Sequence, residues 1–172
     1  PPVRGEPLEV WCSRFKTDIE NYLHSLGDAA PVKSLQEIID SGRFHPQPAP
    51  DLEYFQKQLP PEENAECRAG IAGREMLRGA VRRSLLENSL DALVYPTWSN
   101  PPRLIGDRNT PHGDNSQHIA PHTGFPAITV PMGYVRGSLP VGLQFVGDAY
   151  AEAKLIKLAY AYEQATRHRR PP

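Results

Sequence analysis

The sequence lacks the marks of a nucleic-acid-binding protein, a membrane protein or a disulfide-rich protein. Its 172 residues carry 19 basic and 20 acidic side chains, so bulk electrostatics attract no polyanion and we expect no nucleic-acid partner. No apolar run reaches the length of a membrane span, and we expect no membrane partner. The two cysteines, Cys12 and Cys67, are expected to be buried small apolar side chains rather than a disulfide framework. They assign the chain to no compartment.

The start of the chain also lacks a recognisable leader. Its first ten residues, PPVRGEPLEV, have neither the basic end nor the apolar core of a signal peptide. The chain begins with Pro rather than Met, and we expect it to be an internal piece of a longer polypeptide. Hydrophobic residues make up 39% of the chain and charged residues 23%, which predicts a globular domain with its own core.

Helix breakers are abundant. The chain contains 19 prolines and 13 glycines, concentrated in 44–61 and 95–140, which predicts loop-rich regions there. Apolar residues at spacings of three and four predict helices, and short β-rich runs bounded by Pro or Gly predict strands. The expected helices are 9–26, 35–40 (capped by Ser34), 51–59, 62–88 and 149–165, and the expected strands are 91–97, 126–131 and 141–147. This order indicates a mixed α/β fold whose sheet is completed by strands outside this chain.

The helix expected over 62–88 carries two stripes. Its apolar stripe consists of Ala69, Gly73, Leu77, Val81 and Leu85. Its basic stripe of Arg74, Arg78 and Arg82 is interpreted as a solvated face with local partners such as Glu75. Gly70 and Gly73 destabilise a helix unless another element packs closely against them.

The sequence contains no self-contained catalytic constellation. Four potential metal ligands lie within eleven residues: His112, Asp114, His118 and His122. The prolines around them disfavour a helical frame, so we interpret them as hydrogen-bonding loop residues. A metal hydrolase built on them is kept as an alternative. A Ser/His/Asp triad could be drawn from Ser99, Ser116, His118 and Asp107. None of these residues has the strand–turn–helix setting that the nucleophile of such a triad needs. Neither G-x-S-x-G nor G-x-x-x-x-G-K occurs, and the cysteines lack an electropositive setting.

Three segments nevertheless resemble a known family. They are similar to the C-terminal region of the amidase signature family in the order and spacing of their Gly and Pro residues. The segments are DALVYPT, HTGFPAITVPMGY and LPVGLQFVGDAYAEAKLIKLAYAYEQATRHRRPP. The resemblance covers 91–172 well and the earlier helices more loosely. It implies the C-terminal portion of the amidase signature fold, a mixed β-sheet flanked by helices that is incomplete in this chain. Residues 1–172 would be one fragment, with a helical and Pro-rich part (1–61) and a part holding a helix, strands, a long loop and a final helix (62–172).

The resemblance also implies a chemistry that this chain does not carry. The family hydrolyses amides, or transfers ammonia or an acyl group, with a serine nucleophile, a second serine in a cis peptide and a lysine base. These residues lie in a Gly/Ser-rich region N-terminal to the part seen here, and no Gly-Ser-Ser cluster occurs in this sequence. We therefore assign no catalytic residue to this chain, expect it to be inactive alone, and expect no metal or organic cofactor.

The resemblance further implies partners and pocket residues. The expected partners are the N-terminal part of the same enzyme and a small-molecule amide, and an exposed sheet edge would permit self-association. Residues carried over as substrate-pocket lining are Thr97, Trp98, Ser99, His118 and His122. Trp98 on a loop beside a cleft suits an apolar or aromatic amide, although it could instead cap the core. Two alternative functions remain open: a non-catalytic, amidase-derived binding or structural module, and a fragment similar to the amidotransferase component that amidates charged tRNA.

Overall fold

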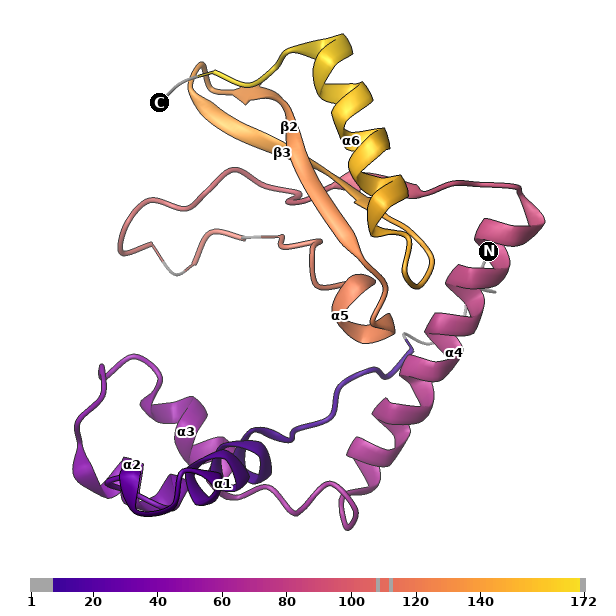
Figure 1. The fold of residues 1–172 in the computed structure, drawn as a ribbon. Helices are drawn as coiled ribbons and strands as arrows, with labels where there is room; N and C mark the ends of the chain where they lie inside the picture. Colours follow the sequence, from indigo (N-terminus) through magenta and orange to yellow (C-terminus); the bar gives the residue numbers. More distant parts are fainter. Residues whose placement is uncertain (1–7, 108, 112, 171–172) are drawn as a thin grey trace. The chain divides into compact units, whose positions relative to one another are not determined.

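A computed structural model of the chain describes residues 8–107, 109–111 and 113–170, and it has the mixed α/β architecture that the sequence predicts (Figure 1). The chain forms two compact units: the described residues up to 74 form the first unit, and those from 75 onward form the second. The boundary falls inside helix α4 (Ala65–Glu87). No helix among the described residues is long and apolar enough to cross a membrane.

The first unit is helical. It contains α1 (Phe15–Ser25), a 3-10 turn (Gly27–Ala29), α2 (Leu35–Ser41), α3 (Ala49–Gln56) and the first part of α4. The expected cap of α2 is confirmed, because the Ser34 hydroxyl accepts the Glu37 N–H at 3.1 Å. α1 packs against α3 through the rings of Phe15 and Phe55, whose centroids are 4.9 Å apart.

The segment before α1 differs from the expected helix. Residues 9–14 are not helical and run along α4 instead. A Cβ added at Gly70 would lie 1.8 Å from the carbonyl oxygen of Trp11, and one at Gly73 would lie 1.7 Å from that of Glu9. The expectation that another element packs closely against these glycines is therefore confirmed. Their missing side chains allow backbone-to-backbone contact.

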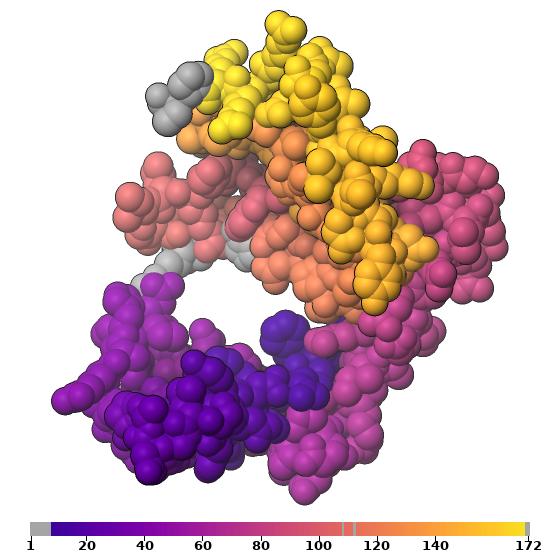
Figure 2. Space-filling view, viewed as in Figure 1, coloured from indigo at the N-terminus to yellow at the C-terminus, as the bar shows by residue number. Residues whose placement is uncertain are grey.

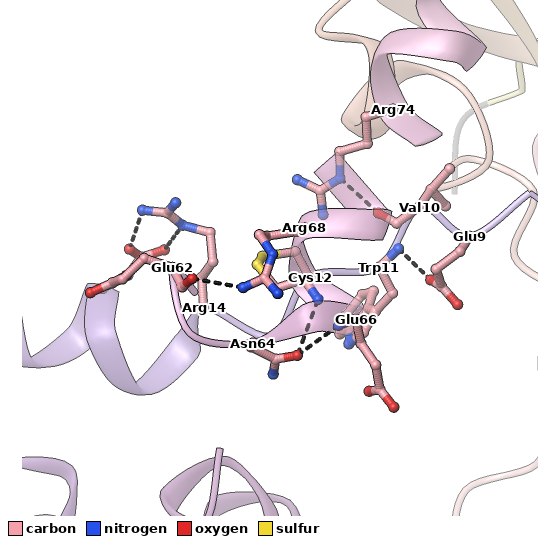
Figure 3. Close-up of a disulfide and its surroundings, with 12 residues drawn as sticks. Glu9, Val10, Trp11, Cys12, Arg14, Glu62, Asn64, Glu66, Arg68 and Arg74 are labelled. Carbon is pink, nitrogen blue, oxygen red and sulfur yellow. Dashed lines mark hydrogen bonds and ion pairs between the residues drawn. A yellow bond between two sulfur atoms is a disulfide. The ribbon is translucent and has the colours of Figure 1, made fainter. Parts of the chain in front are cut away.

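This close approach overturns the prediction for the cysteines. Both are buried, as expected, but Cys12 and Cys67 form a disulfide (Figure 3). Beside it, the Arg74 Nε donates to the carbonyl of Val10 at 2.7 Å, and the Asn64 side chain accepts the Cys67 N–H at 3.2 Å. The prediction failed because it placed Cys12 inside a helix, whereas the extended segment carries it to α4.

The second unit is built on an antiparallel sheet. Its strands are β1 (Leu93–Pro96), β2 (Ala127–Val135) and β3 (Leu139–Val146), in the order β1-β3-β2. β2 is longer than expected, because an irregularity between Pro131 and Gly133 lets pairing continue past the proline. Helix α6 (Glu152–Thr166) lies on the β2–β3 hairpin, and Figure 2 shows its yellow side chains against the orange strands.

Two apolar clusters hold this unit together. One joins α6 to the sheet and contains Val130, Phe145, Leu155 and Ala159. The other joins the later turns of α4 to the sheet and contains Val81, Leu85, Phe125 and Val146. Because successive side chains of a strand point to opposite faces, the neighbours Phe145 and Val146 belong to different clusters.

The basic stripe of α4 is not a simple solvated face, so that prediction was wrong in part. Arg78 does pair with Glu75 at 3.0 Å, as expected, but its Nε also donates to the carbonyl of Thr123 at 2.8 Å. Arg82 pairs with Asp148 at 3.3 Å, and Arg74 binds the segment before α1. A guanidinium reaches acceptors on segments distant in sequence that no local pattern reveals.

Candidate substrate-binding cleft

The long loop after β1 is closed at its base by backbone pairing. The Thr97 N–H donates to the carbonyl of Gly142 at 2.8 Å, so the segment after β1 stays attached to β3. Returning residues then pair with this segment: the Asn115 N–H donates to the carbonyl of Thr97 at 2.9 Å, and the Ser99 N–H donates to that of Gly113 at 2.7 Å. The loop 98–114 therefore leaves and rejoins the sheet at one place.

Asn115 fixes the side chain of Ser99. Its Nδ2 donates to the carbonyl of Pro96 at 2.9 Å, and its amide lies within 3.0 Å of the Ser99 hydroxyl. Next to it, the Asp114 carboxylate accepts bonds from the Ser116 hydroxyl at 2.6 Å and the Gln117 Nε2 at 2.6 Å. These contacts give the loop a defined conformation where it borders the sheet.

A cleft of about 660 Å³ lies between the loop and the β2–β3 hairpin. This volume is in the range of small-molecule sites. Most of the wall is apolar, formed by an indole ring, prolines and valines. The lining residues are Trp98, Ser99, Asn100, Pro101, Pro102, Arg103, Val135, Pro140, Val141 and Gly142.

Gly142 lies where the cleft meets the sheet. A Cβ there would lie 2.7 Å from the Thr97 Oγ1 and 2.7 Å from the Thr129 Cγ2. The two threonine hydroxyls are themselves 3.3 Å apart. The absence of a side chain at Gly142 thus lets the two threonines close over β3.

Arg103 is the charged residue among the described residues that line the cleft. Its Nε is buried and has no hydrogen-bond partner among the described residues. The nearby Asp107 carboxylate accepts bonds from the Thr110 hydroxyl and from the backbone N–H groups of Thr110 and Asn109. The pKa of Asp107 is lowered below its usual value, mainly by the hydrogen bond from the Thr110 hydroxyl. The two backbone hydrogen bonds contribute less, and the charge of Arg103 contributes least.

The five residues predicted to line a substrate pocket lie in different places. Trp98 and Ser99 line the cleft, and Thr97 lies behind Gly142 without lining it. His118 is exposed, with its backbone N–H bonded to Asn115, and His122 lies in the short helix α5 (Ala120–Thr123). A role of these residues in substrate binding stays a prediction.

Among the remaining candidate metal and triad residues, those that the structure describes form no metal-binding group. His112 lies outside the described residues, and those that the structure does describe hold no group of three or more His, Cys, Asp or Glu side chains arranged for a metal ion. The Ser116 hydroxyl donates to Asp114, and the Asp107 carboxylate binds Thr110.

Sequence reasoning missed a polar side-chain pair between β1 and β3. Gln144 is 3% exposed, and its Nε2 donates to the Tyr95 hydroxyl at 3.2 Å. Burial raises the pKa of Tyr95 above its usual value. It also missed Arg103, Asn115 and Gly142. Their only signal was a position in or opposite the long loop, because their contacts join residues far apart in sequence.

Comparisons with known proteins agree on one family. The family model described as "Amidase" matches residues 11–156. The chain is 29% identical to a probable amidase of Arabidopsis thaliana over 177 residues, covering 98% of the chain and 30% of the relative. It is 49% identical over 105 residues to a component of the glutamyl-tRNA(Gln) amidotransferase of Desulforudis audaxviator, covering 56% of the chain and 21% of the relative.

Solved structures give the same result. The peptide amidase of Stenotrophomonas maltophilia is similar with 34% identity and a TM-score of 0.70, covering 92% of this chain and 32% of that one. An amidase family protein of Bacillus anthracis is similar with 29% identity and a TM-score of 0.72, covering 92% of this chain and 29% of that one. This chain therefore spans about a third of the length of these relatives.

Proposed function

The chain belongs to the amidase signature family, and from this premise we propose that it is the C-terminal part of an enzyme that hydrolyses a carboxamide. The observation that carries the proposal is the family match over residues 11–156. The peptide amidase likeness over 92% of the chain supports amide hydrolysis in particular.

The proposed reaction is serine acyl transfer. A serine oxygen attacks the carbonyl carbon, the C–N bond breaks, and the nitrogen leaves as ammonia or an amine after taking up a proton. Water then hydrolyses the acyl ester and regenerates the serine, while backbone amides hold the oxyanion. The serine pair and the lysine would come from the part of the enzyme N-terminal to this chain.

The role of this chain in the proposal is to bind the substrate beside those groups. The indole of Trp98 and the prolines and valines of the cleft present an apolar wall to the non-reacting part of an amide. Ser99, held by Asn115, adds a hydrogen-bonding group of fixed orientation. An apolar or aromatic carboxamide fits this combination.

Amidotransferase activity is the second candidate. Its support is that several curated relatives are components of glutamyl-tRNA(Gln) amidotransferases. The chain carries 19 basic and 20 acidic side chains, so it has no excess of positive charge to attract tRNA. Hydrolysis of a simple carboxamide is therefore the leading candidate.

The test uses the complete polypeptide as its natural source makes it. Aromatic and aliphatic carboxamides and glutamine are each incubated with it, and release of ammonia and of the free acid is measured. Equal ammonia and acid, with inactivation by a serine-directed fluorophosphonate, is the expected result. Ammonia from glutamine alone would favour the amidotransferase. No turnover and no fluorophosphonate labelling would favour the non-catalytic module.

A further inference from the structure

We propose that Arg103 makes the cleft selective for amides that carry a carboxylate at the end of an apolar or aromatic body. This inference rests on the proposed function, because it names the class of substrate that the cleft would take. It assigns a specificity-determining role to a residue of the long loop that the sequence alone did not single out.

The first argument is that the Arg103 guanidinium has no direct ion-pair partner among the described residues. Every other described residue that lines the cleft is uncharged. Three other arginines, Arg14, Arg78 and Arg82, each form an ion pair, at 3.0, 3.0 and 3.3 Å respectively. Arg103 forms none with the carboxylates of the described residues, and the nearby Asp107 carboxylate already accepts bonds from Thr110 and Asn109.

The second argument is the cost of this arrangement. A guanidinium against an apolar wall loses hydration, and a buried N–H without an acceptor carries its full desolvation cost. The Arg103 Nε–H has no acceptor among the described residues. A carboxylate in the cleft would accept from the guanidinium in the forked geometry that arginine favours and would neutralise its charge.

The third argument is the shape of the remaining wall. Trp98, Pro140 and Val141 offer an apolar surface for the body of such a ligand. A volume of about 660 Å³ accommodates an aromatic ring with a short side chain. The cleft therefore suits an amphipathic molecule with an anionic end and an apolar middle.

The experiment compares 3-(4-carboxyphenyl)propanamide with 3-(4-methylphenyl)propanamide as substrates of the complete enzyme. The wild type is expected to prefer the carboxylate in kcat/KM, through a lower KM. Arg103→Gln should lower kcat/KM for the carboxylate about 10- to 100-fold, as expected for charged hydrogen bonds, and change the neutral amide less than about twofold. Arg103→Lys should restore part of the preference. Arg83→Gln, an exposed arginine of α4, is the matched control and should change neither value.

Binding is measured in parallel, by calorimetry with 3-(4-carboxyphenyl)propanoate. Tight binding that Arg103→Gln abolishes supports the inference even if neither amide is hydrolysed, in which case the proposed function alone has failed. Hydrolysis of both amides with the same preference in wild type and Arg103→Gln would overturn the inference and leave the proposed function standing. Equal binding of the propanoate to the wild type and to Arg103→Gln would also overturn the inference.

Discussion

Removing the Cys12–Cys67 disulfide should destabilise the first unit by an amount that its position in the chain determines. The two cysteines are 55 residues apart in sequence. In the chain-entropy account, a closed loop of this size removes about 14 cal/mol/K from the unfolded state, or about 4 kcal/mol at 25 °C. Cys12→Ala, Cys67→Ala and the double variant should each lose about this free energy of unfolding, because either single change removes the whole cross-link.

The assay is urea denaturation followed by Trp11 fluorescence, in a Trp98→Phe background so that the signal reports only the unit with the disulfide. Alkylation before and after reduction confirms the redox state of each sample, and reduced wild type should unfold at the same urea concentration as the double variant. Two results would refute the reasoning: single variants that lose less than about 1 kcal/mol, or losses that add in the double variant.

Three further predictions concern other contacts. Gly70→Ala should destabilise the chain by about 1–3 kcal/mol, because the new methyl group meets the Trp11 carbonyl. Gly79→Ala on the same helix is the control: its methyl group meets nothing within 4 Å, and the change should stabilise the helix. Equal denaturation midpoints of the two variants would contradict this reasoning. Burial should make Tyr95 ionise above the usual tyrosine pKa. Its contribution to stability is therefore present below about pH 10 and is lost as pH rises through the folded-state pKa. A difference ultraviolet titration of the wild type against Tyr95→Phe would show this. Asn115→Ala should release the Ser99 side chain and raise KM in the complete enzyme, with little change in the free energy of unfolding. An unchanged KM would show that Asn115 has no role in substrate binding.

Much of the local structure was predictable from the sequence. The period of apolar residues located α4 and α6, and Ser34 located the start of α2, because these signals depend on neighbours within one or two helical turns. Pro and Gly marked the β2–β3 hairpin in the same way. The two glycines of α4 also indicated a close neighbour, although not which segment it was.

Errors occurred where tertiary contacts override local preference. The sequence predicted a helix beginning at residue 9, yet residues 9–14 are not helical, because carbonyl groups of this segment pack on Gly70 and Gly73. Hairpin pairing carried β2 past Pro131, where a local rule ends a strand. In both cases the stabilising contacts come from residues outside the segment itself.

By itself, the sequence determined the fold class, most helices and strands, and the family to which the chain belongs. The fold class and the elements follow from local periodicity and from their Pro and Gly boundaries. The family follows from the resemblance of three segments to a known family, which the match over residues 11–156 confirms. Only the tertiary structure decided that Cys12 meets Cys67, that Arg78 binds Thr123, and that Arg103 lines the same cleft as Val141. These contacts join residues with large separations, and their geometry exists only after the backbone has folded.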